Sequence, residues 1–249
     1  MRFYLISLFP AQLSQFFNKG IFGRAVEKGL IEVHFIQLRD FAPGPHHKVD
    51  DQPFGGTRGM VLKPDVLYDA ITAIPGYDTA RILSMCPKGR SYTQAMATVL
   101  AQSTDVILIC GYYEGIDERI YQALPIEKIS IGEFILSSGE LPALAIVESV
   151  ARLIPGVIQK TESLQDDTYL SGLLEFPQYT QPREWRGFNV PSVLVSGHHA
   201  RILQWRREAA LKETLFTKPE LLINFEPSEG DQIVLESLLK EEPDGEQGH

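Results

Sequence analysis

Three pairs of adjacent acidic residues are the first groups in this sequence that could do chemistry: Asp50-Asp51, Asp117-Glu118 and Asp166-Asp167. A carboxylate held against a reacting group can accept a proton, and carboxylate oxygens can also bind magnesium. Two of the pairs also have a structural explanation. Asp117-Glu118 can begin a helix, where acids suit the helix dipole, and Asp166-Asp167 lies in a polar stretch that water can solvate.

Arg152 is a lone cation inside the apolar run AIVESVARLIPGV. A charge in such surroundings must be paired or must act on a bound group, because removing it from water costs free energy. The sequence leaves both roles open for this residue.

Glycine-containing segments follow three apolar runs, at 85–90, 110–115 and 131–139. Glycine lets a backbone approach a ligand closely or adopt a positive φ, although ordinary tight turns need it too. No strand is followed by G-x-G-x-x-G, and the cluster at 55–59 lacks the Gly-Lys-Ser/Thr ending of a P-loop. The two commonest nucleotide-cofactor motifs are therefore excluded.

The elements that must position these residues alternate between strand and helix. Apolar or alternating runs predict strands at Phe3–Phe9, Ile31–Leu38, Arg81–Cys86 and Asp105–Cys110. Helical patterns occur within 11–30, from Pro64 to about 74, from a capping box at Ser91–Gln94 to about 102, and over Leu141–Leu153. This alternation predicts an α/β domain with a largely parallel sheet that ends near residue 158. Ligands of such sheets bind beyond the carboxyl ends of the strands, where the three glycine-containing segments lie.

The remainder of the chain is organised differently. Residues 159–172 are polar, as a linker is, and a long helix is expected over about His199–Leu215. Residues 39–63 have no clear period, and loops of this length in compact domains are usually functional or disordered.

Charge is distributed unevenly along the 249 residues, whose net charge is −9. Residues 183–218 hold seven Lys and Arg against three acids, whereas residues from 219 onward hold one Lys against nine acids. A basic stretch before an acidic end keeps nucleic acid open as a partner, although a solvated helix face would look the same. We expect the last ten residues to be mobile, because they contain hardly any apolar side chain.

Composition also excludes several classes of protein. At 44% hydrophobic residues the chain can build a core, and no apolar run reaches the roughly 18 residues that a membrane helix needs. The first residues lack the cleavage pattern of a signal peptide. Cys86 and Cys110 are too few for a disulfide framework or a four-cysteine zinc site, so we expect buried, reduced thiols in a cytoplasmic protein.

Five segments in one order resemble the bacterial tRNA (guanine-N1)-methyltransferases, the TrmD family: VDDQPFGGTRGMVLKPD, MCPKGRSYTQ, LICGYYEGIDERI, SIGEFILSSGELPALAIVESVARLIPGV and VPSVLVSGHHARILQWRR. The resemblance extends from Met1 to about Leu222. It implies the SPOUT class of fold, in which a largely parallel sheet carries a deep trefoil knot and a small, mainly helical domain follows. Residues 1–158 would be the knotted domain, 159–172 the linker, and 173–249 the tRNA-binding domain with its acidic tail.

The resemblance also implies an activity. Members of the family transfer a methyl group from S-adenosylmethionine to N1 of guanosine 37 in tRNA when guanosine also occupies position 36. They act as homodimers whose active sites take residues from both subunits. Whether Mg²⁺ assists the reaction stays open, and no metal-ligating residue is predicted.

Residue by residue, the resemblance makes Asp167 the general base and Arg152 the stabiliser of charge on guanine. Asp50, Arg183, His199, Arg201 and Arg206 are the residues expected on the tRNA side. The residues expected around the methyl donor are Pro87, Gly111, Glu114, Ile131, Gly132, Glu133, Phe134, Ile135, Leu136, Ser138 and Gly139.

The sequence departs from the family pattern at a few positions. Tyr112 replaces an arginine beside the donor pocket, Ser138 replaces a glycine, Thr57-Arg58 replaces smaller residues, and His198 replaces an asparagine. Ser138 should be tolerated if its φ is negative. The altered donor-side motif keeps open a tRNA-binding module without catalysis. The acidic pairs separately keep open a magnesium-dependent phosphate-ester hydrolase that uses Asp50-Asp51 with Asp117-Glu118.

Overall fold

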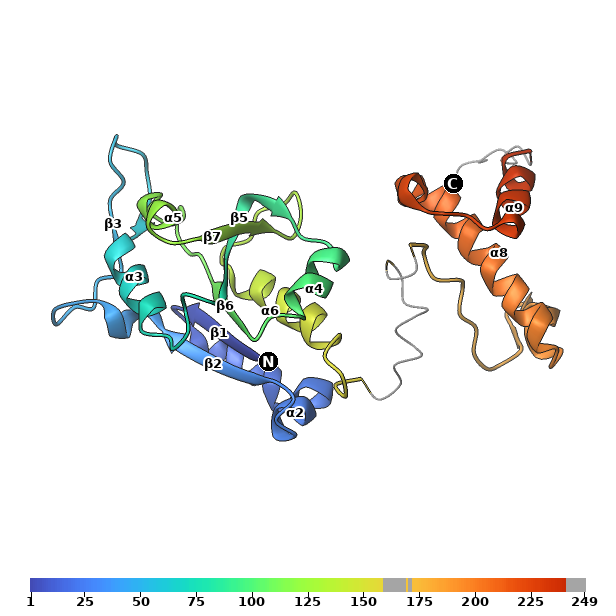
Figure 1. Ribbon diagram of the computed structural model, residues 1–249, viewed down its shortest axis with the longest axis horizontal. Helices are drawn as coiled ribbons and strands as arrows, with labels where there is room; N and C mark the ends of the chain where they lie inside the picture. Colours follow the sequence, from blue (N-terminus) through green and yellow to red (C-terminus); the bar gives the residue numbers. More distant parts are fainter. Residues whose placement is uncertain (159–168, 170–171, 241–249) are drawn as a thin grey trace. The chain divides into compact units, whose positions relative to one another are not determined.

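The computed structural model describes residues 1–158, 169 and 172–240 (Figure 1). The chain forms two compact units, Met1–Gln159 and Lys160–His249, and each is described by itself. Asp166-Asp167, most of the predicted linker and the last nine residues lie outside the described residues.

The first unit is built on a five-stranded sheet. Its strands are β1 (Arg2–Ser7), β2 (Glu32–Gln37), β5 (Arg81–Ser91), β6 (Asp105–Ile109) and β7 (Ile126–Ser130), in the order β2-β1-β6-β5-β7. Every neighbouring pair is parallel, so the predicted α/β class with a parallel sheet is confirmed. The knot stays a prediction.

Helices cover both faces of this sheet. Alternate side chains of β1 separate into two cores: Phe3 and Leu5 pack on one face, and Tyr4 and Ile6 on the other. The first core also holds side chains of α1 (Pro10–Ser14), α2 (Gly20–Glu27), α4 (Gln94–Leu100) and α6 (Glu140–Ala151). The second is covered by α3 (Pro64–Thr72) and α5 (Arg119–Ala123). Figure 1 shows α3 and α5 away from α4 and α6.

Two boundaries differ from the prediction. The strand β5 continues to Ser91, with a register shift between Met85 and Arg90, so the segment expected to be a loop after a strand interrupts one strand instead. Ser91 pairs with Ser130 and is not the helix cap. Thr93 caps α4, its hydroxyl accepting the Met96 N–H at 3.3 Å.

The long segment after β2, residues 38–63, contains regular structure near both of its ends. It contains a 3₁₀ turn (Leu38–Phe41) and a small hairpin in which β3 (Asp50–Asp51) pairs with β4 (Val61–Leu62). Figure 1 shows this hairpin projecting from the unit. Phe54, between the two strands, is 95% exposed.

The second unit is mainly helical. It contains the hairpin of β8 (Glu184–Trp185) and β9 (Phe188–Asn189), the long helix α8 (His199–Thr217), α9 (Glu229–Lys240) and 3₁₀ turns at Ser192–Val195 and Pro219–Asn224. The predicted helix over about His199–Leu215 is confirmed as α8. The acidic region is not wholly without structure, because α9 packs Val234 and Leu235 against the small core of Leu173, Ala210 and Leu211. In the described part of the chain, the helices are too short or too polar to cross a membrane.

One ion pair ties α9 to α8. The Arg207 guanidinium donates two hydrogen bonds to Asp231, at 2.8 and 2.9 Å, and the Ser228 N–H and hydroxyl donate two more. Arg207 and these donors hold the pKa of the buried Asp231 carboxyl well below its usual range. These four hydrogen bonds stabilise the Asp231 carboxylate in its charged form. The Arg207–Asp231 pair thus links α8 to α9, whose shared apolar core is small.

We expect Asp231→Asn to lower the free energy of unfolding of the second unit by about 1–3 kcal/mol at neutral pH. Because folding lowers the pKa of this carboxyl, its stabilisation is full above the unfolded value of about 3.9 and disappears as the pH falls further. Both tryptophans, Trp185 and Trp205, lie in this unit, so urea unfolding followed by tryptophan fluorescence reports on it. Glu236→Gln, an exposed change on the same helix, is the control. Equal losses for Asp231→Asn at pH 7 and pH 3 would contradict the ionic explanation.

Candidate functional site

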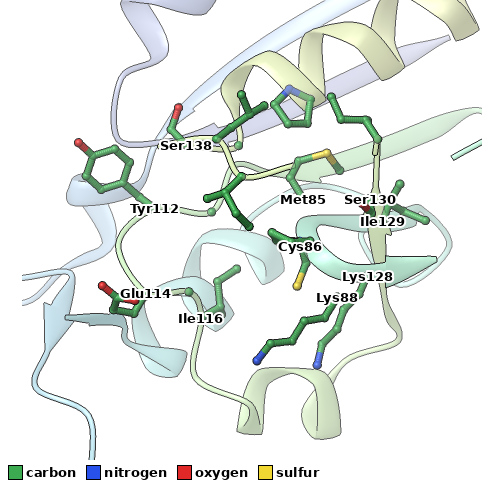
Figure 2. A pocket seen from close by; sticks show the side chains of 18 of the residues that line it. Met85, Cys86, Lys88, Tyr112, Glu114, Ile116, Lys128, Ile129, Ser130 and Ser138 are labelled. Atoms are coloured by element: carbon green, nitrogen blue, oxygen red, sulfur yellow. The ribbon is translucent and has the colours of Figure 1, made fainter. Parts of the chain in front are cut away.

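A cavity of about 370 Å³ opens at the carboxyl edge of the sheet, beside the irregular part of β5 and the last residues of β6 and β7. Residues from all three glycine-containing segments predicted from the sequence line it, so the structure brings them together at one edge of the sheet (Figure 2). This is the edge at which parallel sheets bind ligands.

Close backbone contacts hold the segments together. The Gly139 N–H donates to the Gly111 carbonyl at 2.8 Å, and a Cβ at Gly139 would lie 2.6 Å from the Gly111 nitrogen. A Cβ at Gly89 would likewise lie 2.4 Å from the Ile129 nitrogen. Because no side chain fits at these positions, glycine is what allows the strand ends to meet so closely.

All the residues predicted around a methyl donor line this cavity except Glu133, which is exposed on the same segment. Ile135 is 80% exposed, and Ile131 and Leu136 also face the cavity, so part of its wall is apolar. Glu114 contributes a carboxylate at the left of Figure 2, apart from Lys88 and Lys128 at the bottom of the view.

Sequence reasoning singled out Glu118 but missed the two lysines that line this cavity, Lys88 and Lys128. Lys128 lies on β7, and its ammonium donates to Glu118 at 2.7 and 2.8 Å and lies 3.9 Å from the centre of the Tyr121 ring. The Glu118 carboxylate raises the pKa of Lys128. Lys88 extends in the same direction at this end of the cavity (Figure 2). In IEKIS, Lys128 stands between Ile126 and Ile129, and a cation inside a short strand was the available signal.

A buried polar contact lies beside the cavity. The Ser7 hydroxyl, at the end of β1, donates to the Glu140 carboxylate, at the start of α6, at 2.5 Å. Both side chains are buried, and the second Glu140 oxygen has no hydrogen-bond partner. Burial, and the nearby Glu140 carboxylate to a lesser extent, raise the pKa of the Cys110 thiol well above its usual value. Cys110 is therefore an inert, protonated thiol, as predicted, whereas Cys86 is only half-buried and lines the cavity.

The two departures beside the cavity fit the structure. Ser138 is not among the residues with a positive φ, so the condition for tolerating serine is met. The Tyr112 ring packs edge-on against Phe9 and Tyr113, with ring centres 5.4 and 4.8 Å apart. Its hydroxyl points away from Cys86 and Met85 in Figure 2, so Tyr112 contributes an aromatic packing contact at this position.

The projecting hairpin is fastened to the rim of the cavity. The Glu114 N–H donates to the Met60 carbonyl at 3.0 Å, and the Leu62 N–H donates to Gly115 at the same distance. Gly59 has φ +94°, and a Cβ there would lie 2.3 Å from the Glu114 side chain. Asp50 lies in β3 and does not line the cavity.

Two of the acidic pairs singled out from the sequence lie within the described residues, and Asp51, Asp117 and Glu118 among them form ion pairs. Asp51 pairs with Lys48 at 3.0 Å, and Arg119 and Lys48 lower the pKa values of Asp117 and Asp51, respectively. Glu118 is bound to Lys128, as described above. Among the described residues, no three His, Cys, Asp or Glu side chains are grouped as metal ligands would be. These pairings give the structural explanation of Asp117-Glu118 and remove the geometric basis for the hydrolase hypothesis.

The remaining predicted residues lie elsewhere. Arg152 is the half-buried C-cap of α6 and is not part of the cavity wall, and Asp167 lies outside the described residues. Arg183, His199 and Arg201 are exposed in the second unit. Arg206 in that unit places its guanidinium 4.8 Å from the centre of the Phe176 ring.

Comparison with known proteins decides which family has this arrangement. Residues 1–224 match the family described as tRNA (Guanine-1)-methyltransferase TrmD. The chain belongs to this family. Over 242 residues it is 44% identical to the tRNA (guanine-N(1)-)-methyltransferase of Pelotomaculum thermopropionicum, covering 96% of each chain. The enzyme of the same name from Geobacillus kaustophilus is 45% identical over 242 residues, covering 97% of this chain and 99% of the relative.

Membership in the tRNA (guanine-1)-methyltransferase family makes this protein a methyltransferase, as the resemblance predicted. The matched residues include the three cavity segments and α6, together with most of the second unit. The cavity at the ends of β5, β6 and β7 is therefore the candidate site of a methyltransferase.

We expect Gly139→Ala to destabilise the first unit of this methyltransferase by about 1–3 kcal/mol, because the added carbon would force the Gly111 backbone away. Gly132→Ala is the matched control, since the Phe134 ring that its Cβ would meet is exposed and can turn aside. Thermal unfolding of both variants, followed by circular dichroism, makes the comparison. Equal stabilities for the two variants would show that the Gly139–Gly111 contact does not require glycine.

Proposed function

We propose that this methyltransferase transfers a methyl group from S-adenosylmethionine to N1 of guanosine 37 in tRNA that also carries guanosine at position 36. The acceptor class agrees with the names of the relatives, which are tRNA (guanine-N(1)-)-methyltransferases. We also propose that the reaction takes place in the cytoplasm, because its acceptor is tRNA. The observation that carries the proposal is the cavity at the ends of β5, β6 and β7 in a member of this family.

The cavity fits the proposed donor. Its volume of about 370 Å³ lies in the range of small-molecule sites. Gly111 and Gly139, whose backbones are in contact, both line it, and Ile131, Ile135 and Leu136 supply an apolar wall. S-adenosylmethionine would supply a methyl group already activated by its sulfonium, so the protein contributes alignment and exclusion of water.

The chain's own residues must handle the proton and the charge of the acceptor. Guanine N1 carries a proton at neutral pH and is a poor nucleophile until a base removes it. We assign that role to Asp167, whose carboxylate would take the N1 proton in a closed site. As the proton leaves, negative charge spreads to the neighbouring carbonyl oxygen, and Arg152 is assigned to stabilise it because a guanidinium stays protonated.

The position of Arg152 favours an active site shared between two chains. Gly139 lines the cavity and precedes α6, whereas Arg152 caps the other end of this helix. Pro142 of this helix lines the cavity, and at 1.5 Å per residue about 15 Å of helix separates it from Arg152, which is long for one chain's Arg152 to reach its own donor cavity. A homodimer in which the partner contributes Arg152 resolves this separation.

The second unit is proposed to bind tRNA. Its exposed Arg183, His199 and Arg201, together with Arg206, provide cations for phosphate contacts, which would make binding weaken with added salt. In this division, residues 1–158 bind the donor, 159–172 link the units, and 173–249 hold the acceptor. Asp50 is assigned to the guanine side of the site, and a contribution of Mg²⁺ is left to experiment.

The acceptor rule is tested with two tRNA transcripts, one with guanosine at 36 and 37 and one with adenosine at 36. We expect label from S-adenosylmethionine at N1 of guanosine 37 in the first transcript only, with the modified base mapped by nuclease digestion. Labelling of both transcripts would overturn the requirement for guanosine 36. Retention of tRNA without methylation would make the protein a binding module without catalysis.

The shared site is tested by mixing two inactive variants. Arg152→Ala should retain donor binding and lose about 10²–10³ in turnover, as removal of a charge-stabilising donor does. Ile135→Arg should weaken donor binding instead, because it would place a cation in the apolar wall of the cavity that is proposed to hold the cationic donor. In a shared site the mixed dimer regains one working site, so co-refolding equal amounts should restore about one quarter of wild-type activity.

The two variants measured alone are the controls, and calorimetric titration with S-adenosylmethionine checks their donor binding. If both residues act within one chain, the mixture stays as inactive as its components. A loss of donor affinity in Arg152→Ala as large as its loss of turnover would overturn the role assigned to this arginine.

A further inference from the structure

The hairpin of the second unit displays two large aromatic side chains on one face. Trp185 on β8 and Phe188 on β9 are directly paired across the strands. Their side chains are 58% and 74% exposed. Directly opposite residues of an antiparallel pair project to the same side, so the two rings form one apolar surface in water.

The turn between them is rigidly specified. Arg186 and Gly187 have φ values of +54° and +85°, the conformation of a two-residue turn whose twist matches the paired strands. A positive φ is unfavourable for arginine, so this residue is held there by the hairpin. The tip is therefore a defined two-residue turn, and below it the Val190 N–H donates to the Arg183 carbonyl at 2.9 Å.

The same tip carries positive charge beside the rings. The Arg186 guanidinium carbon lies 4.9 Å from the centre of the Trp185 ring, and Arg183 directly precedes β8. Glu184 is the one acid among residues 183–189. An exposed aromatic pair flanked by arginines matches what unpaired nucleotides require: rings for the bases and guanidinium groups for the phosphates.

We propose that this hairpin is a nucleobase-stacking platform, on which Trp185 and Phe188 hold an unpaired base of tRNA while Arg183 and Arg186 contact adjoining phosphates. The proposal rests on the proposed function, since tRNA is the acceptor there. It adds a subsite that binds only nucleotides whose bases are unstacked. Electrostatic contacts to phosphates alone would not require unstacked bases.

Fluorescence of Trp185 provides a direct test. The chain has two tryptophans, so Trp205→Phe leaves Trp185 as the single reporter. Titration with the guanosine 36/37 transcript should quench this emission, because a stacked base quenches an indole. A blunt RNA duplex without unpaired bases should bind at low salt without comparable quenching, with fluorescence anisotropy of labelled RNA confirming that it is bound.

Variants separate stacking from charge. Trp185→Leu keeps an apolar side chain but removes the ring, and should weaken tRNA binding about 5- to 100-fold while leaving its salt dependence unchanged. Trp185→Phe should recover most of that loss. Arg186→Gln should instead reduce the slope of log affinity against log salt by about one.

Two outcomes would overturn the platform. Unquenched Trp185 in an enzyme that binds and methylates tRNA would refute it and leave the proposed function intact. If Trp185→Leu instead dissociates the proposed homodimer, as measured by light scattering, the rings contact a second copy of the chain and not tRNA. Absence of both tRNA binding and methylation in the unaltered protein would refute the proposed function itself.

Discussion

The close approach of backbones at the ends of β5, β6 and β7 is the constraint on which the candidate site depends. Gly139 rests on Gly111 through a hydrogen bond of 2.8 Å, and Gly89 lies against Ile129 where no Cβ could fit. Since side chains are excluded at these contacts, the strand ends meet without filling the space between them. The shape of the cavity therefore depends on the absence of a Cβ at Gly89 and Gly139.

Charge around the cavity is balanced largely by local pairing. Lys128 and Glu118 bind each other beside the Tyr121 ring, and Arg119 holds Asp117. The buried Glu140 accepts from Ser7 and so ties the start of α6 to the end of β1. These pairs stabilise the rim of the cavity and leave Glu114, on the segment fastened to Met60, as an acid at the cavity wall.

The two units solve different physical problems. The first buries two cores on a parallel sheet, which gives the site rigid walls. The second has a small core of Leu173, Ala210 and Leu211, and its helices are joined by the Arg207–Asp231 ion pair. With so small a core, the second unit leaves all four strand residues of the β8–β9 hairpin exposed.

The sequence by itself determined the alternation of strands and helices, the parallel sheet and the family. Local periodicity suffices for the first two because it records which faces are buried, and the motifs in order suffice for the third. It also identified the three glycine-containing segments, since such sheets bind ligands at one edge.

Only the tertiary structure decided which groups meet there. Ser91 has the spacing of a helix cap, yet it pairs with Ser130 because β5 continues past its irregularity. The pairing of Lys128 with Glu118, the contact of Ser7 with Glu140 across 133 residues, and the placing of Arg152 at the far end of α6 have no local signature. Each depends on strand order and on backbone contacts between distant segments, which neither periodicity nor composition records.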